Sequence, residues 1–258
     1  IQDSESVFAI GDVCLMETPM YQKGHPQVAN VAINQAKNLA KNLKKIVDSV
    51  KETNTMIVID GYHGFMAIPT DLKEIEDRIF YIAGSYKYAQ GGEGCCFMAV
   101  PENSCHRPLY TGWFAGFTNL ATDGGNTGYS RGGYRFAGST MDFSALYRLE
   151  AVLTLFKRDG LSVPKIHAHI QHLQKNFRNH LLEIDHHYLT EKNILSVDYN
   201  YHGHFLTFAM PSQEHTKNMH DELRAINVWT DYRGSRLRFG FGIYQNDCID
   251  LKALIKLL

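Results

Sequence analysis

Two polar residues follow apolar segments of the chain at positions where folded proteins often carry out chemistry. Asp60 comes directly after the apolar run 56–59, and Lys87 comes shortly after the apolar run 79–83, between two tyrosines and before a glycine-rich turn. A lysine in a crowded apolar pocket loses its proton more readily and becomes a nucleophile, and its main use is Schiff-base formation with a carbonyl compound. A charged aspartate at the end of a buried strand needs a partner. The alternatives are an exposed loop or helix-capping aspartate and a solvated lysine beside a turn.

The elements around these residues predict an α/β fold. The runs 56–59, 79–83 and 95–100 are apolar on both faces, which is typical of strands in a mostly parallel sheet covered by helices. An amphipathic helix is expected over about residues 27–50, after a short apolar run at 13–16. Ligands of such sheets bind at the carboxyl ends of the strands, so we expect Asp60 and Lys87 to face one crevice.

The second half of the chain predicts a smaller α+β domain. Residues 103–140 are rich in glycine and aromatic residues, which indicates a long functional loop rather than a disordered one. Helices are expected over 141–158 and 164–182, short strands near 194–197, 205–210 and 237–241, and a last helix from Asp250. We therefore predict a large domain over 1–145, incomplete at its N-terminal side, and a small C-terminal domain over 146–258.

Composition excludes several classes of function. The formal net charge of −1 gives no bulk attraction for nucleic acid or an anionic membrane, and no apolar run approaches the roughly 20 residues that a membrane helix needs. The five cysteines include no CxxC pair, and no signal peptide begins the chain, which predicts reduced thiols in a cytoplasmic protein. No metal site is predicted, because no carboxylate lies at a ligand spacing from the histidines. The glycines at 91, 92 and 94 do not match a nucleotide-binding fingerprint.

The order of Asp60, His63 and Lys87 resembles the fold-type-I enzymes that use pyridoxal 5'-phosphate (PLP), in particular the aminotransferase class V family. This resemblance implies that Asp60 binds the pyridine nitrogen and keeps it protonated, that His63 lies near the phenolic oxygen, and that Lys87 holds the cofactor as a Schiff base. It also implies a homodimer with the active site at the subunit interface, and a small-molecule amino-acid substrate.

Within class V, the segments around Tyr86, Trp113 and Arg238 resemble kynureninase. Tyr86, directly before the lysine, matches a tyrosine that contacts the cofactor phosphate, and Trp113 in the 111–116 segment matches a tryptophan that also reaches it. The 135–140 segment resembles a class V turn that contacts the cofactor region of the partner subunit, which makes Ser139 and Thr140 candidate cofactor ligands. The asparagine that kynureninases carry at this turn is not evident here.

The resemblance also assigns two residues to the substrate. Arg238, in the 231–240 segment, matches the arginine that grips the substrate carboxylate, for which a planar guanidinium is well suited. Arg233 and Arg236 lie close enough in sequence to leave this choice open. Tyr21 falls where kynureninases place an active-site tyrosine. The phosphate-binding segment that precedes this tyrosine in the family is not found, so we expect the chain to be a fragment or a reduced relative.

The resemblance implies hydrolytic Cβ–Cγ cleavage of kynurenine or a related amino acid, with Lys87 as the general base. Class V transamination or epimerisation remains open, as does a degenerate relative that only binds a partner or metabolite. A cysteine desulfurase is set aside, because the chain has no cysteine between Glu191 and Arg238 and carries His63 where desulfurases tend to have glutamine.

Overall fold

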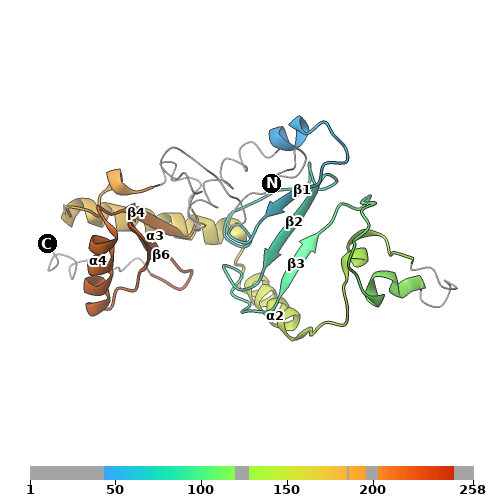
Figure 1. Ribbon diagram of the computed structural model, residues 1–258. Coiled ribbons are helices and arrows are strands. Elements are labelled where there is room, and N and C mark those ends of the chain that lie inside the picture. The colour runs from blue at the N-terminus through green and yellow to red at the C-terminus, as the bar shows by residue number, and fades with distance from the viewer. Residues whose placement is uncertain (1–43, 120–127, 185, 196–202, 247–258) are drawn as a thin grey trace. The chain divides into compact units, whose positions relative to one another are not determined.

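The computed structural model describes residues 44–119, 128–184, 186–195 and 203–246 (Figure 1). The chain forms two compact units. The first contains the described residues up to Met66 and those from Thr70 to Asp159, and the second contains Ala67–Pro69 and the described residues from Gly160 onward. The boundary between functional domains that the sequence predicts at 145/146 stays a prediction.

The first unit is built on a three-stranded sheet in the order β1-β2-β3. Strands β1 (Ile57–Asp60) and β2 (Ile79–Gly84) are parallel, with Asp60 opposite Ile82, while β3 (Cys96–Ala99) is antiparallel to β2. All three predicted strands are confirmed. The direction of the third strand differs from that of the expected mostly parallel sheet, because the segment 85–95 is too short for a crossover connection and turns the chain back.

One helix packs on this sheet and another packs on the turn that follows β2. A helix described over 44–49 contributes Val47, which packs with Ile59, Ile75 and Ile79. Helix α2 (Ser144–Arg158) lies within the predicted 141–158 and buries its apolar face against the turn that follows β2. The contacts of α2 are made by Ala145 and Leu149 on the helix and by Ala89 and Cys95 on the turn.

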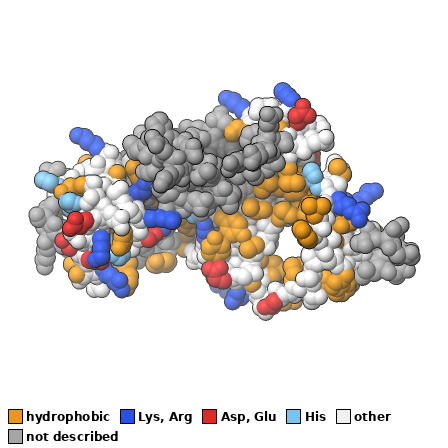
Figure 2. Space-filling model, viewed as in Figure 1, with side chains coloured by type: hydrophobic (Ala, Val, Ile, Leu, Met, Phe, Trp, Pro, Cys, Tyr) orange, Lys and Arg blue, Asp and Glu red, His pale blue; other side chains and the backbone are white. Residues whose placement is uncertain are grey.

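Between β3 and α2 the chain forms two short 3₁₀ segments, η1 (Trp113–Asn119) and η2 (Gly132–Phe136). The Ser130 amide donates a hydrogen bond to the Ala115 carbonyl at 2.7 Å, which ties the two together. Many large apolar side chains of this unit are exposed, and Figure 2 shows hydrophobic side chains gathered over it. The most exposed are Leu109, Tyr110 and Tyr134.

The second unit contains helices α3 (Val163–Ile184) and α4 (Gln213–Ala225), the short η3 (Glu191–Asn193) and an antiparallel sheet in the order β4-β6-β5. The strands are β4 (Phe205–Ala209), β5 (Asp231–Arg233) and β6 (Arg236–Gly240). Its core is aromatic, because Phe177 of α3 packs with Phe208 and Phe239 of the sheet.

The predicted helix 164–182 and the strands 205–210 and 237–241 are confirmed, and Ile194 of the predicted strand 194–197 forms a single bridge with Phe208. Helix α4 and strand β5 were not predicted. Helix α4 begins after Ser212, whose hydroxyl accepts the His215 amide at 3.2 Å. The run 13–16, most of helix 27–50, residues 196–197 and the helix from Asp250 lie outside the described residues.

Within the part of the chain that the structure describes, no helix is both long enough and apolar enough to cross a membrane. Among these same residues, no group of three or more histidine, cysteine, aspartate or glutamate side chains could hold a metal ion.

Candidate active site

Two glycines hold the carboxyl ends of β1 and β2 against each other. A side chain at Gly61 would overlap the ring of Tyr81 on β2, and a Cβ at Gly84 would lie 2.5 Å from the Tyr62 ring. The Gly61 amide also donates to the Ile82 carbonyl at 2.7 Å. Each strand end therefore accepts an aromatic ring from the other strand, which any larger residue at the two glycines would displace.

Lys87 and His63 meet at this edge of the sheet. The Lys87 Nζ lies 2.8 Å from Nε2 and 3.1 Å from Nδ1 of His63, and both side chains are partly buried. The ammonium can donate to whichever ring nitrogen carries no proton. Residues 24 apart in the sequence are thus in hydrogen-bonding contact, as the strand-end rule predicts for a mixed sheet whose first two strands are parallel.

Asp60 ends β1 at the same edge. Its Oδ1 accepts the amide of Tyr62 at 3.0 Å, which shapes the turn that leads to His63. Burial first, and then the charge of Asp60, raise the pKa of Tyr81 to about 12. The carboxylate therefore acts electrostatically on a side chain of the neighbouring strand.

Two tyrosine rings lie beside the Lys87 amine. Nζ is 5.5 Å from the centroid of Tyr86 and 5.9 Å from that of Tyr62, and the two rings are 5.6 Å apart. Tyr86 was predicted as a cofactor ligand and is 41% exposed. Tyr62 was missed by sequence reasoning, although its place between Asp60 and His63 is a signal that could have found it.

The glycine-rich turn after Lys87 is closed by hydrogen bonds to Ser85. The buried Ser85 hydroxyl donates to the Gly92 carbonyl at 2.6 Å, and the Gly91 amide donates to the Ser85 carbonyl at 2.9 Å. Gly92 and Gly94 have φ angles of 72° and 96°, in the left-handed region that glycine adopts without strain. The glycine-rich turn predicted from the sequence thus fixes the backbone conformation next to Lys87.

The other predicted cofactor residues of the first unit lie in the segment between β3 and α2. Trp113 is half-exposed and packs with Phe114 and Phe117 at centroid distances of 4.5 and 5.4 Å. Ser139 and Thr140 are exposed in the loop before α2. Their roles in cofactor binding stay predictions, and Tyr21 lies outside the described residues.

Arg238, the predicted carboxylate ligand, belongs to the second unit. It is paired with Asp231 in the β5–β6 register and forms an ion pair with that side chain, and its guanidinium lies 5.0 Å from the Phe205 ring centroid. Arg236 lies opposite Arg233 in the same register. The structure thus orients Arg238 by an acidic and an aromatic neighbour, while its role toward a substrate stays a prediction.

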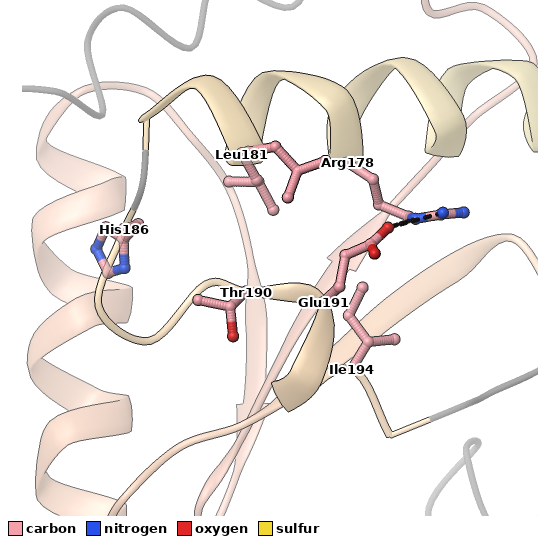
Figure 3. A pocket seen from close by; sticks show the side chains of 7 residues that line it. Arg178, Leu181, His186, Thr190, Glu191 and Ile194 are labelled. Atoms are coloured by element: carbon pink, nitrogen blue, oxygen red, sulfur yellow. Dashed lines mark hydrogen bonds and ion pairs between the residues drawn. The ribbon is translucent and has the colours of Figure 1, made fainter.

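The second unit also has a small surface pocket beside the ion pair between Arg178 and Glu191 (Figure 3). His186 lies in its wall with its Nδ1 accepting the amides of Tyr188 and Leu189, each at 3.0 Å. The ion pair connects α3 to the segment that follows it, and the His186 contacts order the turn between them.

Residues 15–224 match the family model for aminotransferase class V. The chain belongs to this family. The match contains the segment from Asp60 to Lys87 and the loop with Trp113, Ser139 and Thr140, and it ends before Arg238. The α/β fold of fold-type-I PLP enzymes, predicted from the sequence, is confirmed.

Several solved structures have a similar fold. The apo cysteine desulfurase of Thermococcus onnurineus NA1 is similar with a TM-score of 0.62 and 16% identity over 84% of this chain and 54% of its own. The cysteine desulfurase CsdA of Escherichia coli is similar with a TM-score of 0.56 and 14% identity over 91% of this chain and 54% of its own.

A variant of the cystine C–S lyase C-DES, with glycine covalently linked to its PLP cofactor, has a TM-score of 0.54 and 17% identity over 75% of this chain and 49% of its own. The chain spans about half the length of these structures. Among curated proteins, none matches the chain significantly. At these identities the likeness concerns the fold, and the predicted closeness to kynureninase stays a prediction.

PLP is the cofactor of this family, and the donor set at the strand ends fits it. An amine, an imidazole and a carboxylate lie at one sheet edge, and these are the groups that the cofactor's aldehyde, phenolic oxygen and ring nitrogen require. Lys87 would hold the aldehyde carbon, and Asp60 would hold the ring nitrogen.

Proposed function

We propose that the protein is a PLP-dependent enzyme that acts on an α-amino acid, with Lys87 as the residue that binds the cofactor covalently. The observation that carries this proposal is the contact between Lys87 Nζ and His63 at the carboxyl ends of β1 and β2. A surface lysine beside a turn would have no reason to be packed among an imidazole and two tyrosine rings. Bound PLP draws electrons away from the substrate Cα and so weakens the bonds to that carbon.

In this proposal Lys87 has two roles. It would hold the cofactor covalently, and as a free amine it would be the base that takes the proton from the substrate Cα. His63 stays within hydrogen-bonding distance of Nζ and orients it during that transfer. Asp60 keeps a negative charge at the end of β1, which favours a protonated ring nitrogen.

Arg238 is proposed to bind the substrate carboxylate. A guanidinium that already pairs with the carboxylate of Asp231 is held with its fork accessible to another anion, since the side chain is only partly buried. This assignment rests on the resemblance of the 231–240 segment to the kynureninase C-terminal segment.

The specific reaction that we propose is kynureninase-like hydrolysis of a Cβ–Cγ bond. It is supported by the segments around Tyr86, Trp113 and Arg238, while a desulfurase reaction is disfavoured by the lack of any cysteine between Glu191 and Arg238. Class V transamination or epimerisation, which uses the same lysine and arginine, is the alternative.

We also propose a homodimer in the cytoplasm. The exposed apolar side chains of the first unit, Leu109 and Tyr110 among them, would be covered by a second copy. The absence of any CxxC pair fits a reducing compartment.

The test is to add PLP to the purified full-length protein, record its absorbance, and then supply kynurenine or 3-hydroxykynurenine. A band at the edge of the visible range and release of an anthranilate would support both parts of the proposal. A band without anthranilate release would retain the PLP enzyme and overturn the kynureninase reaction. Absence of a band at saturating PLP would overturn both.

A further inference from the structure

Tyr62 lies against the Lys87 amine, and neither the family match nor the motifs assign it a role. Its ring occupies the space above Gly84, where a Cβ would come within 2.5 Å of it. Its centroid is 5.9 Å from Lys87 Nζ, and it is tilted by 48° from the Tyr86 ring at 5.6 Å. The ring therefore stands between the end of β2 and the amine that is proposed to do the chemistry.

The orientation of Tyr62 is fixed at both ends of its side chain. Its backbone amide donates to Asp60 Oδ1 at 3.0 Å, and its hydroxyl interacts with the side chain of Cys96, which lies opposite Gly84 in the β2–β3 register. The hydrogen bond to Cys96, and then burial, raise the pKa of Tyr62. The hydroxyl accordingly stays neutral, and the ring presents an uncharged π surface to its neighbours.

We propose that Tyr62 is a positioning residue that holds Lys87 Nζ beside its ring and stabilises the ammonium form of that side chain. An aromatic ring attracts a cation within about 6 Å of its centroid, and here two rings lie within that range of the same nitrogen. The inference rests on the proposed role of Lys87, since an amine that takes a proton from the substrate must keep it until it is returned.

The charge state of Nζ depends on every titratable group around it. His63 contacts Nζ from the turn after β1, Tyr62 and Tyr86 lie beside it, Asp60 ends β1 and Cys96 faces Tyr62 from β3. The two tyrosine rings attract the cation through their π surfaces. Removal of one ring therefore changes the ammonium stability and leaves the count of ionised groups unchanged.

The experiment measures how fast a trace of acetic anhydride acetylates Lys87 at different pH values in the full chain without PLP, by mass spectrometry of the Lys87 peptide. In Tyr62→Leu the midpoint of this pH dependence is expected to fall by about half a pH unit, because the free amine is favoured once the ring is lost. Tyr62→Phe, which keeps the ring, is expected to retain the wild-type midpoint. Tyr147→Leu, an exposed tyrosine on α2, is the matched control.

An unchanged midpoint in Tyr62→Leu would overturn the proposal, and so would an equal fall in Tyr62→Phe, which would assign the effect to the hydroxyl. If Tyr62→Leu does not fold, Tyr62→Met supplies a longer, flexible apolar side chain without a ring and is held to the same criterion. Because no cofactor is used, the labelling result is independent of whether PLP binds to Lys87.

Discussion

The two sheets of this protein present their polar residues in opposite ways. In the first unit, His63 and Lys87 lie in the turns that follow two parallel strands, and their side chains contact each other. In the second unit, Arg236 and Arg238 stand on β6 itself and alternate with the buried Leu237 and Phe239. A parallel pair collects functional groups at its carboxyl ends, whereas an antiparallel sheet with one buried face displays them on the other.

The functional groups of the two units are therefore held in place by different interactions. The position of Lys87 depends on glycines and turn hydrogen bonds, because Gly61 and Gly84 make room for rings and Ser85 closes the loop. The position of Arg238 depends on the aromatic core beneath β6. We therefore expect core substitutions in the second unit to act mainly on stability, and substitutions at the strand ends of the first unit to act mainly on chemistry.

The largest effect is expected from Phe208→Ala. Phe208 is fully buried and packs against Phe177 and Phe239, so the substitution should lower the free energy of unfolding by about 3–5 kcal/mol. Urea unfolding followed by circular dichroism measures it, with Leu182→Ala, an exposed position on α3, as the control. Equal losses in the two variants would show that the second unit lacks a cooperative aromatic core.

Asp60→Asn tests the expectation that substitutions at the strand ends of the first unit act mainly on chemistry. Loss of the charge that would hold the cofactor's ring nitrogen should lower kcat/KM by about a hundredfold, which corresponds to about 2.7 kcal/mol. Thermal unfolding should change little, because the asparagine side-chain oxygen can still accept the Tyr62 amide. Asp77→Asn, an exposed aspartate of the same unit, is the control, and a lowered unfolding temperature with unchanged kcat/KM would make Asp60 a structural residue.

Stability of the second unit should fall in mild acid through His204. Burial lowers the pKa of His204 to about 4, and its Nε2 donates to the Ala67 carbonyl at 3.1 Å. The unfolded side chain has the ordinary histidine pKa of 6.5, so the unfolded state binds more protons between that pH and about 4. The stability contribution is therefore present above pH 6.5 and lost as the pH falls.

Between pH 7 and 5 this linkage should cost about 2 kcal/mol. Urea unfolding at the two pH values measures it, and His204→Gln should remove most of the difference. Burial also lowers the pKa of His186. The wild type and His204→Gln should therefore both show a smaller additional loss of stability at the lower pH. A pH dependence that is unchanged in His204→Gln would contradict the assignment.

The smallest effect is expected from Arg238→Lys. A lysine keeps the charge but loses the two parallel hydrogen bonds to a carboxylate, so KM for the amino acid should rise about tenfold with kcat nearly unchanged. Arg236→Lys is the informative comparison, since Arg236 was left open as the carboxylate ligand. A larger rise in Arg236→Lys than in Arg238→Lys would move the assignment to Arg236.

Sequence reasoning predicted the described strands of the first unit and placed Asp60 and Lys87 at their carboxyl ends, because apolar runs that end abruptly have few structural alternatives. It missed the reversal of β3, since apolar character on both faces indicates burial but not strand direction. It also missed α4, whose buried residues Thr216, Met219 and Leu223 form a narrow stripe on an otherwise polar segment.

Tyr62 stands between two motif residues, but the contacts that give it a role could not be predicted from the sequence. Its role depends on Gly84, which is distant along the chain and becomes its neighbour only when β1 and β2 pair. The ion pair between Arg238 and Asp231 depends in the same way on the β5–β6 register. Motif spacing identifies residues that are chemically suited to a site, while strand pairing decides which of their neighbours hold them in place.

The most direct test of the central claim is to map where PLP attaches. The full-length protein is incubated with PLP, reduced with borohydride, digested and analysed by mass spectrometry, beside Lys87→Ala and the exposed-lysine control Lys157→Ala. The account predicts one predominant reduced PLP adduct on the Lys87 peptide, which is lost in Lys87→Ala and retained in Lys157→Ala. An adduct on another lysine, or equal labelling of Lys87→Ala and wild type, would contradict it.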